Sequence, residues 1–309
     1  MTAVTEKRVG ALSYVCVSLD GAFDVAKTFD CGQCFRFDRV ENSIHESEYF
    51  GIAYGRAVSF ASDRGMLYIY NTTEEEYNSL WKHYLSLDLN YDEIDDDLRS
   101  RCGSEAFCEA VNYGRGIRIL NQEPYEALIS FIISQNNNIP RIKQIIERLS
   151  SLCGKPIEVC EEMEKHISGR SSMCAFPTAK ALYALGAEGL FAAKTGFRAK
   201  YIYDALSKVL SGEIDPSAIV SFDSTAAGVE YLCSIKGVGP KVASCVLLFS
   251  GERYDAFPVD VWIKRAMQKY FPDKDFSSDF FGDYAGIAQQ YLFYYERYLG
   301  GQKMQNPKC

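Results

Sequence analysis

The hydrophobic pattern of the chain changes its period once, near Thr73, and this change is the strongest constraint on the fold. Before it, apolar and polar residues alternate in short runs, which is typical of antiparallel strands with one buried face. These runs cover residues 11–19, 34–40, 49–54, 57–61 and 66–70. After Thr73 the large apolar residues recur at helical spacing, at Tyr77, Leu80, Trp81, Tyr84 and Leu85. We therefore expect a small antiparallel sheet followed by helices.

Helical patterns dominate the remainder of the sequence. Pro124 and Pro140 each open an apolar stretch, as proline does at the first position of a helix, and similar patterns cover 198–210 and continue from 256 onward. At 309 residues the chain exceeds the usual size of one domain, and no repeat or low-complexity linker divides it. We predict an α+β fold, with an antiparallel β-sheet domain and flanking helices at 1–100 and a helical region at 101–309.

The overall charge limits how such a chain could bind nucleic acid. The net charge is −8 and the isoelectric point is near 5.1, which excludes a protein coated with basic residues. Contact with nucleic acid must come from a local patch or from backbone amides. The acidic run 92–97 is most simply a solvated helix face. No apolar run approaches the length of about 18 residues that a membrane span requires, so no membrane partner is expected.

The cysteines favour a reduced, intracellular protein. There are 11 of them, an odd number, and no secretory signal precedes them. Cys31 and Cys34 have the spacing of a metal knuckle, but no second pair follows and the three histidines are scattered. We interpret them as ordinary thiols and predict no metal site made of side chains.

The segment 232–245 has the pattern of two helices joined by a glycine turn. Gly237 and Gly239 allow a tight turn around Val238, and Pro240 begins the second helix. The first turn of that helix presents free N–H groups, which bind a phosphate without a basic side chain. This hairpin therefore makes the binding of a nucleic-acid phosphate compatible with an acidic composition.

Lys241 lies in the first turn of the same helix, where the helix dipole disfavours a cation. A neutral amine is favoured there, and burial would lower its pKa further, as an amine nucleophile requires. A lysine that only contacts a backbone phosphate explains the position equally well. Asp260, nineteen positions later, stands behind a proline where a helix starts. It could simply cap that helix, but a carboxylate beside an amine also suits displacement at an anomeric carbon.

Together, the hairpin, Lys241 and the sequence Phe257-Pro-Val-Asp-Val-Trp262 resemble the helix-hairpin-helix (HhH-GPD) DNA glycosylase superfamily. The lysine is typical of its bifunctional members. The resemblance implies excision of a base through a Schiff base on Lys241, with Asp260 beside it, followed by β-elimination. Only Cys309 follows Asp260, so the iron–sulfur cluster of several relatives is not expected. We expect no cofactor, although the hairpin carbonyls could hold a structural cation.

Three further stretches are similar to the 8-oxoguanine DNA glycosylase/AP lyase family, and nearer to its bacterial and archaeal members. In 29–37, the resemblance assigns to the Gly32 carbonyl the recognition of the N7–H of the oxidised base. A buried carbonyl can distinguish the two bases: it accepts a hydrogen bond from the N7–H of 8-oxoguanine, but it repels the N7 lone pair of guanine, and that repulsion is costly. In 284–293, Gln289 is implied to bind the Watson–Crick edge and Phe293 to stack on the base, with Cys245 on its other face.

The remaining family positions concern the DNA around the extruded nucleotide. The resemblance implies that Asn136 fills the gap in the duplex and that Arg141 and Arg198 read the orphaned cytosine. An asparagine run could instead be only a helix cap, and arginines are commonly surface charges. Phe197 and Trp262 replace the tyrosine and histidine of many eukaryotic members. These departures leave the opposite-base preference open, and no role is assigned to Trp262.

The expected substrate is double-stranded DNA containing 8-oxoguanine opposite cytosine, bound by a monomer. The expected location is intracellular, in the cytoplasm or nucleoid of a prokaryote or the nucleus of a eukaryote. Two alternatives remain: a related glycosylase for alkylated or other oxidised bases, and a hairpin module that binds distorted DNA without cutting it. The presence of both Lys241 and Asp260 argues against the second, because phosphate binding needs neither.

Overall fold

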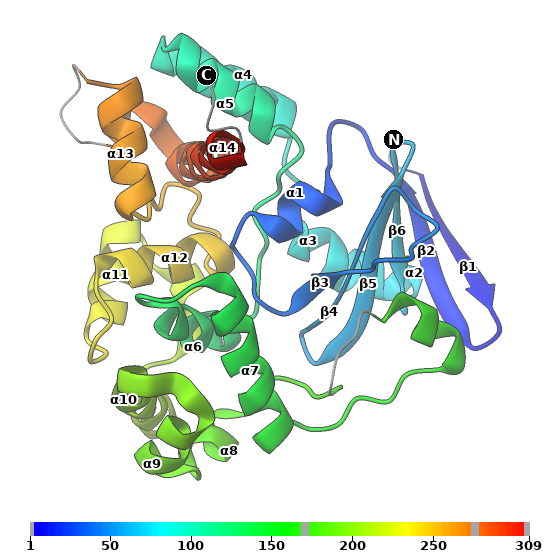
Figure 1. The fold of residues 1–309 in the computed structure, drawn as a ribbon, viewed down its shortest axis with the longest axis vertical. Helices are drawn as coiled ribbons and strands as arrows, with labels where there is room; N and C mark the ends of the chain where they lie inside the picture. The colour runs from blue at the N-terminus through cyan, green and yellow to red at the C-terminus, as the bar shows by residue number, and fades with distance from the viewer. Residues whose placement is uncertain (1–2, 168–172, 273–277, 306–309) are drawn as a thin grey trace.

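The computed structural model describes residues 3–167, 173–272 and 278–305. It places a six-stranded antiparallel sheet beside a helical body (Figure 1), which confirms the predicted α+β fold. The strand order is β1-β2-β6-β5-β4-β3. The strands are β1 (Val4–Val9), β2 (Leu12–Ser18), β3 (Phe37–Arg39), β4 (Ser47–Ala53), β5 (Arg56–Asp63) and β6 (Met66–Tyr70). The alternating pattern predicted all of them except β1, whose mostly exposed residues carry little apolar signal.

The helices follow the sheet in sequence, apart from α1, and form the other half of the molecule (Figure 1). The first six α-helices are α1 (Val25–Asp30), α2 (Glu74–Glu76), α3 (Lys82–Tyr84), α4 (Tyr91–Cys102), α5 (Glu105–Gly114) and α6 (Pro124–Ser134). The others are α7 (Ile139–Cys153), α8 (Ala179–Tyr183), α9 (Gly186–Leu190), α10 (Ala199–Ser211), α11 (Thr225–Cys233), α12 (Pro240–Ser250), α13 (Val261–Tyr270) and α14 (Ala285–Gln305). Short 3-10 or π turns include η1 (Tyr77–Trp81), η2 (Glu161–His166), η3 (Phe191–Thr195), η4 (Gly196–Arg198), η5 (Pro216–Ser221) and η6 (Asp279–Tyr284).

One predicted helix start is wrong. The apolar pattern from residue 256 onward suggested a helix there, but α13 begins at Val261. Pro258 disfavours helical backbone at the residue before it, and Asp260 caps the helix two residues later. The five residues from Ala256 to Asp260 therefore form a loop, which leads the carboxylate of Asp260 to the start of α13.

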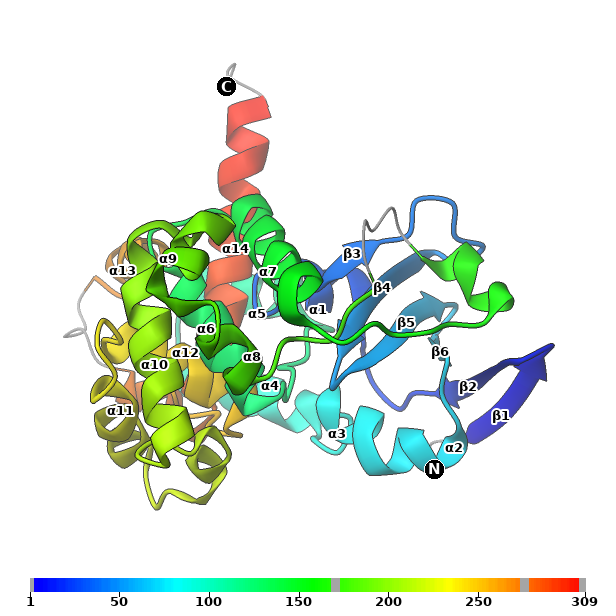
Figure 2. The ribbon, with the colours of Figure 1, turned by 90° about the horizontal axis from the view of Figure 1, so that it is seen from below.

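The two faces of the sheet are covered by different parts of the chain. One face packs against α1 and α3, with Phe60, Trp81 and Tyr84 among its buried aromatic residues. The other face is covered by the segment after α7, whose Met163 is fully buried in a cluster on that face. Figure 2 shows this green segment running from the helical body along the sheet. The division at residue 100 stays a prediction, since each part of the chain contributes to the other's packing.

A buried polar contact fastens this segment to the sheet. His166 Nδ1 lies 2.6 Å from Glu48 Oε1, and Ser59 Oγ donates to the same oxygen at 2.6 Å. The His166 ring stacks on Tyr70 with 3.9 Å between centroids. Burial alone would raise the pKa of Glu48, but hydrogen bonds from His166, Ser43 and Ser59 bring it below its usual value.

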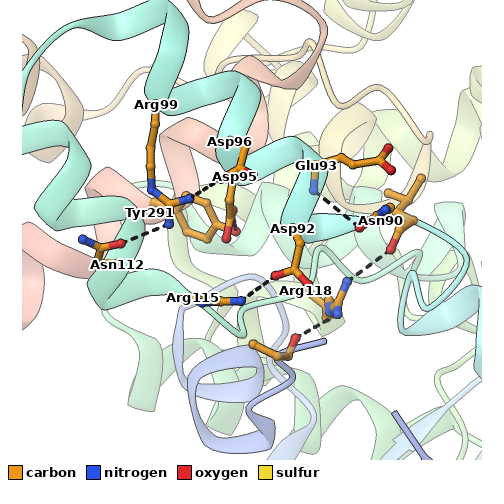
Figure 3. Close-up of polar contacts among 12 residues, drawn as sticks. Asn90, Asp92, Glu93, Asp95, Asp96, Arg99, Asn112, Arg115, Arg118 and Tyr291 are labelled. Atoms are coloured by element: carbon orange, nitrogen blue, oxygen red, sulfur yellow. Dashed lines mark hydrogen bonds and ion pairs between the residues drawn. The ribbon is translucent and has the colours of Figure 1, made fainter. Parts of the chain in front are cut away.

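The acidic run 92–97 is only partly a solvated face. Asp92, Glu93 and Asp96 are exposed, as predicted, but Asp95 is 2% exposed and accepts a hydrogen bond from Tyr291 of α14 at 2.7 Å (Figure 3). Asp95 directly follows Ile94 on the apolar face of α4, and that face packs into the helical core. The prediction of a fully solvated face was therefore wrong at Asp95.

Candidate active site

The hairpin predicted at 232–245 is present as α11, a tight turn and α12. Gly237 has φ +80°, and a Cβ there would lie 2.4 Å from the ring of Tyr201, so glycine is required for both conformation and space. Gly239 is the N-cap of α12, and no side chain caps this helix. The side chain of Val238 is buried, so the backbone is the part of the turn that can meet a ligand. The first-turn N–H groups of α12 are available to an anion.

Asp260 is held by the start of α13. Its carboxylate accepts a hydrogen bond from Ile263 N at 2.8 Å, the geometry of an N-cap. A carboxylate has further acceptor capacity beyond this one contact. The capping interpretation is thus correct, and it leaves the carboxylate able to act on a neighbouring charge.

A cavity of about 70 Å³ lies between the hairpin, α14 and the turn after α1. We call it the Lys241 cavity. Its walls include all six residues predicted for catalysis and base recognition: Gly32, Lys241, Cys245, Asp260, Gln289 and Phe293. Four separate parts of the chain supply them, and tertiary folding brings them together.

Lys241 and Cys245 lie one turn apart on α12, and Asp260 faces them. Burial raises the pKa of the Cys245 thiol; the adjacent Lys241 opposes this rise, and Asp260 adds to it. Lys241 and Asp260 therefore both lie close to the Cys245 thiol. An amine and a carboxylate that line the same cavity can act together on a sugar.

The side of the Lys241 cavity formed by α14 has an unused acceptor. Gln289 is 5% exposed, and its Oε1 has no hydrogen-bond partner among the described residues. Phe293 is half-buried one turn further along. Opposite them, Gly32 has φ +82°, and a Cβ there would lie 3.6 Å from Phe293 Cε1. A buried unpaired acceptor is costly, which favours a ligand that donates a hydrogen bond to Gln289.

The residues predicted for the DNA gap lie on the loop between α6 and α7. Asn136 is exposed with φ +48°, a conformation that side chains rarely adopt. The cap of α7 is Asn138, which accepts from Arg141 N at 3.0 Å. The helix-cap explanation therefore applies to Asn138 and not to Asn136. A residue with an exposed side chain and a backbone in this sparsely populated region is common at functional sites.

The two predicted cytosine-reading arginines differ in environment. Arg141 is exposed, whereas Arg198 is 3% exposed. Arg198 donates to the carbonyls of Gln135 at 2.7 Å, Asn136 at 2.8 Å and Thr195 at 3.2 Å. Burial lowers the pKa of Arg198, and the nearby Arg141 lowers it further. In this structure Arg198 holds the Asn136 loop, and its contact with an orphaned base stays a prediction.

The two departures from the eukaryotic pattern are both surface residues. Phe197 is 47% exposed, with the Arg198 guanidinium 4.4 Å from the centre of its ring. Trp262 is 37% exposed in the first turn of α13, and Arg265 lies 5.9 Å from its ring centre. Trp262 is not among the residues that line the Lys241 cavity.

Comparison with known proteins decides the family. Residues 17–128 match the model for "8-oxoguanine DNA glycosylase, N-terminal domain", and residues 129–279 match "HhH-GPD superfamily base excision DNA repair protein". The chain is 30% identical over 287 residues to "N-glycosylase/DNA lyase OGG1" of Arabidopsis thaliana, covering 86% of this chain and 75% of that protein. The chain belongs to the 8-oxoguanine DNA glycosylase family.

Solved structures extend this relationship over nearly the whole of the glycosylase. The 8-oxoguanine glycosylase/lyase of Clostridium acetobutylicum, solved with double-stranded DNA containing cytosine opposite 8-oxoG, is 38% identical with a TM-score of 0.85. The match covers 96% of this chain and 98% of that one. A 3-methyladenine DNA glycosylase of Archaeoglobus fulgidus, at 20% identity and a TM-score of 0.69, covers 92% and 98% and shares the fold.

Sequence reasoning missed several residues that line the Lys241 cavity. Phe131, Phe249, Pro258 and Gln290 line it as well. Phe131 and Phe249 stack on each other at 5.4 Å within apolar helices, where they look like ordinary core residues. Gln290 directly follows Gln289, and a second amide inside an apolar helix was the one signal that could have identified it.

Cys31 and Cys34, the pair with metal-knuckle spacing, are both buried thiols. Burial raises the pKa of Cys31 to about 12 and also raises that of Cys34, which disfavours the thiolate that a metal binds. In 3–167, 173–272 and 278–305, no group of three or more His, Cys, Asp or Glu side chains could hold a metal ion. No helix within these ranges is both long and apolar enough to cross a membrane.

Proposed function

We propose that this protein is a bifunctional DNA glycosylase and AP lyase that removes 8-oxoguanine from duplex DNA. The observation that carries the proposal is the Lys241 cavity, where Lys241 and Asp260 meet an unpaired buried acceptor on Gln289. Neither phosphate binding nor helix capping requires that combination. Family membership and the names of its relatives, N-glycosylase/DNA lyases, support the same activity.

In this mechanism the Lys241 amine attacks C1′ of the extruded nucleotide and forms a carbon–nitrogen bond. The glycosidic bond breaks, and the base leaves with the bonding electron pair and takes up the proton that the Lys241 nitrogen loses. Asp260 stabilises the positive charge that develops on the sugar. Opening of the sugar ring gives a Schiff base with Lys241, and loss of a C2′ proton then expels the 3′ phosphate.

Recognition of the base uses the opposite walls of the cavity. Gly32 presents a backbone carbonyl to the N7–H of 8-oxoguanine, where guanine has a lone pair that the carbonyl repels. Gln289 Oε1 accepts from an N–H on the Watson–Crick edge. Phe293 and Cys245 cover the two faces of the ring, as expected for a flipped base.

The DNA partner follows from the same scheme. The hairpin amides of Gly237, Val238, Gly239 and Lys241 bind the backbone phosphate, and Asn136 occupies the vacated stack. Arg141 and Arg198 face the orphaned cytosine. We also infer that the protein is an intracellular monomer and uses no cofactor.

Borohydride trapping tests the nucleophile. On duplex DNA with 8-oxoguanine opposite cytosine, the native chain should form a covalent adduct and Lys241→Gln should form none. Equal trapping by both would exclude Lys241 as the nucleophile. Unmodified guanine in the same sequence tests the base, since comparable release of guanine would contradict the role of Gly32.

A further inference from the structure

Two glutamine side chains hold the turn that carries Gly32. Gln290 Nε2 of α14 donates to the Cys31 carbonyl at 2.8 Å. On the other side, Gln122 Nε2 donates to the Gln33 carbonyl at 2.8 Å. The peptide groups before and after the Gly32 carbonyl are thus both fixed by hydrogen bonds.

The Gly32 carbonyl itself has no such contact. Across 3–167, 173–272 and 278–305, no hydrogen bond reaches this oxygen. Gly32 has φ +82° and no side chain, so rotation of the peptide that carries its carbonyl is limited only by the fixed peptides on either side. A carbonyl that must face one atom of a base needs that limit, because a small misplacement costs much of the discrimination.

Gln33 secures its own side of the turn. Its fully buried amide donates to the carbonyls of Thr28 and Arg118 at 2.8 Å each and accepts from Leu120 N at 2.9 Å. This side of the turn is therefore fixed within the N-terminal half of the chain. The Cys31 side is instead held from the distant helix α14.

We propose that Gln290 is a positioning residue for substrate selection, which aligns the Gly32 carbonyl with the oxidised base by holding the Cys31 peptide. The inference rests on the proposed function. Gln290 is 2% exposed and lies next to Gln289, so one turn of α14 both binds the base and orients the acceptor opposite it. A shift of α14 would therefore move the Gly32 carbonyl and change the selection of 8-oxoguanine over guanine.

Gln290→Met removes the donor but keeps an unbranched side chain of similar length. We expect release of 8-oxoguanine, measured in single turnover, to slow by about tenfold, because a misplaced Gly32 carbonyl would lose most of its hydrogen bond to the base. Cleavage at a preformed abasic site opposite cytosine should stay within about twofold of the native rate, because that reaction involves no base. Tyr295→Phe is the matched control, since it removes a hydrogen bond from α14 to Glu109 away from the turn.

Gln290→Glu adds a readout that a purely structural role would not produce. A protonated carboxyl donates to the Cys31 carbonyl, whereas the carboxylate repels it. For Gln290→Glu and for the native chain, the rate of 8-oxoguanine release is divided by the rate of abasic-site cleavage at each pH. The ratio of the variant, corrected by dividing it by the ratio of the native chain, should rise as the pH is lowered. The same corrected ratio should be independent of pH in Gln290→Met.

The outcomes separate the two proposals. If the native chain releases no 8-oxoguanine from duplex DNA, the proposed function fails. If the native chain is active, and Gln290→Met matches it or loses both activities equally, only the positioning role of Gln290 is overturned. A corrected ratio in Gln290→Glu that does not depend on pH overturns it as well.

Discussion

The hydroxyl of Tyr291 donates a hydrogen bond to the Asp95 carboxylate at 2.7 Å, and both side chains are buried between α14 and α4 (Figure 3). Tyr291 also packs on Gly114, where a Cβ would lie 2.4 Å from its ring. This contact fixes the rotation of α14 and hence the direction of Gln289 and Phe293, two residues away on either side. The opposite face of the same helix thus supports the Lys241 cavity.

Asp95→Asn should remove a pH dependence of stability. Burial raises the pKa of Asp95, so its contribution to the free energy of unfolding is greatest below about pH 4 and declines as pH rises to the folded pKa. Asparagine stays neutral and still accepts from Tyr291. Relative to the native chain, the variant should gain stability from about pH 4 upward, measured by urea denaturation at several pH values. A difference independent of pH would contradict a raised pKa.

Asp260→Asn should separate catalysis from helix capping. Asparagine caps a helix as well as aspartate does, so the free energy of unfolding should change by less than about 1 kcal/mol. Loss of the charge should slow base release by about 100-fold or more. Asp260→Ala, which removes both roles, should lose stability in addition. If Asp260→Asn releases the base at the native rate, the carboxylate has only a capping role.

Arg198→Met and Arg141→Met should differ in stability. The first leaves the buried carbonyl of Thr195 and two partly buried carbonyls of the Asn136 loop without their donor, and should lower the free energy of unfolding by about 1–3 kcal/mol. The second alters an exposed side chain and should change it by less than about 0.5 kcal/mol. Excision opposite each of the four bases should show a weaker cytosine preference in Arg141→Met. An unchanged base profile would remove Arg141 from cytosine recognition.

The Glu48–His166 contact should govern part of the acid sensitivity. Although burial opposes it, hydrogen bonding lowers the pKa of Glu48, so its stabilising contribution is present above about pH 4 and lost as pH falls through the folded pKa. His166→Leu should lower the free energy of unfolding by about 1–3 kcal/mol at neutral pH, because it removes one hydrogen-bond donor from a buried carboxylate and leaves it only Ser43 and Ser59. Thermal unfolding across pH 3 to 8 measures both effects. A stable His166→Leu variant with native acid sensitivity would show that the contact contributes little.

Local sequence was sufficient for the strands β2 to β6, the hairpin and the two functional groups on helix starts. Each depends on interactions within a few residues: alternation in a strand, glycine in a tight turn, or a proline and a cap before a helix. The family resemblance then named the residues of the base site. The structure places all six of those catalytic and base-recognition residues around one cavity.

Tertiary structure decided what those residues contact. Asp95 looked solvated because its neighbours in sequence are charged, and only the packing of α14 buries it. Likewise, Gln290 and Cys31 are far apart in the chain, and a hydrogen bond between such positions has no local signature. The sequence by itself determined which chemical groups are present and the local backbone that carries them. Their burial, partners and mutual orientation arise from long-range packing, which no local pattern encodes.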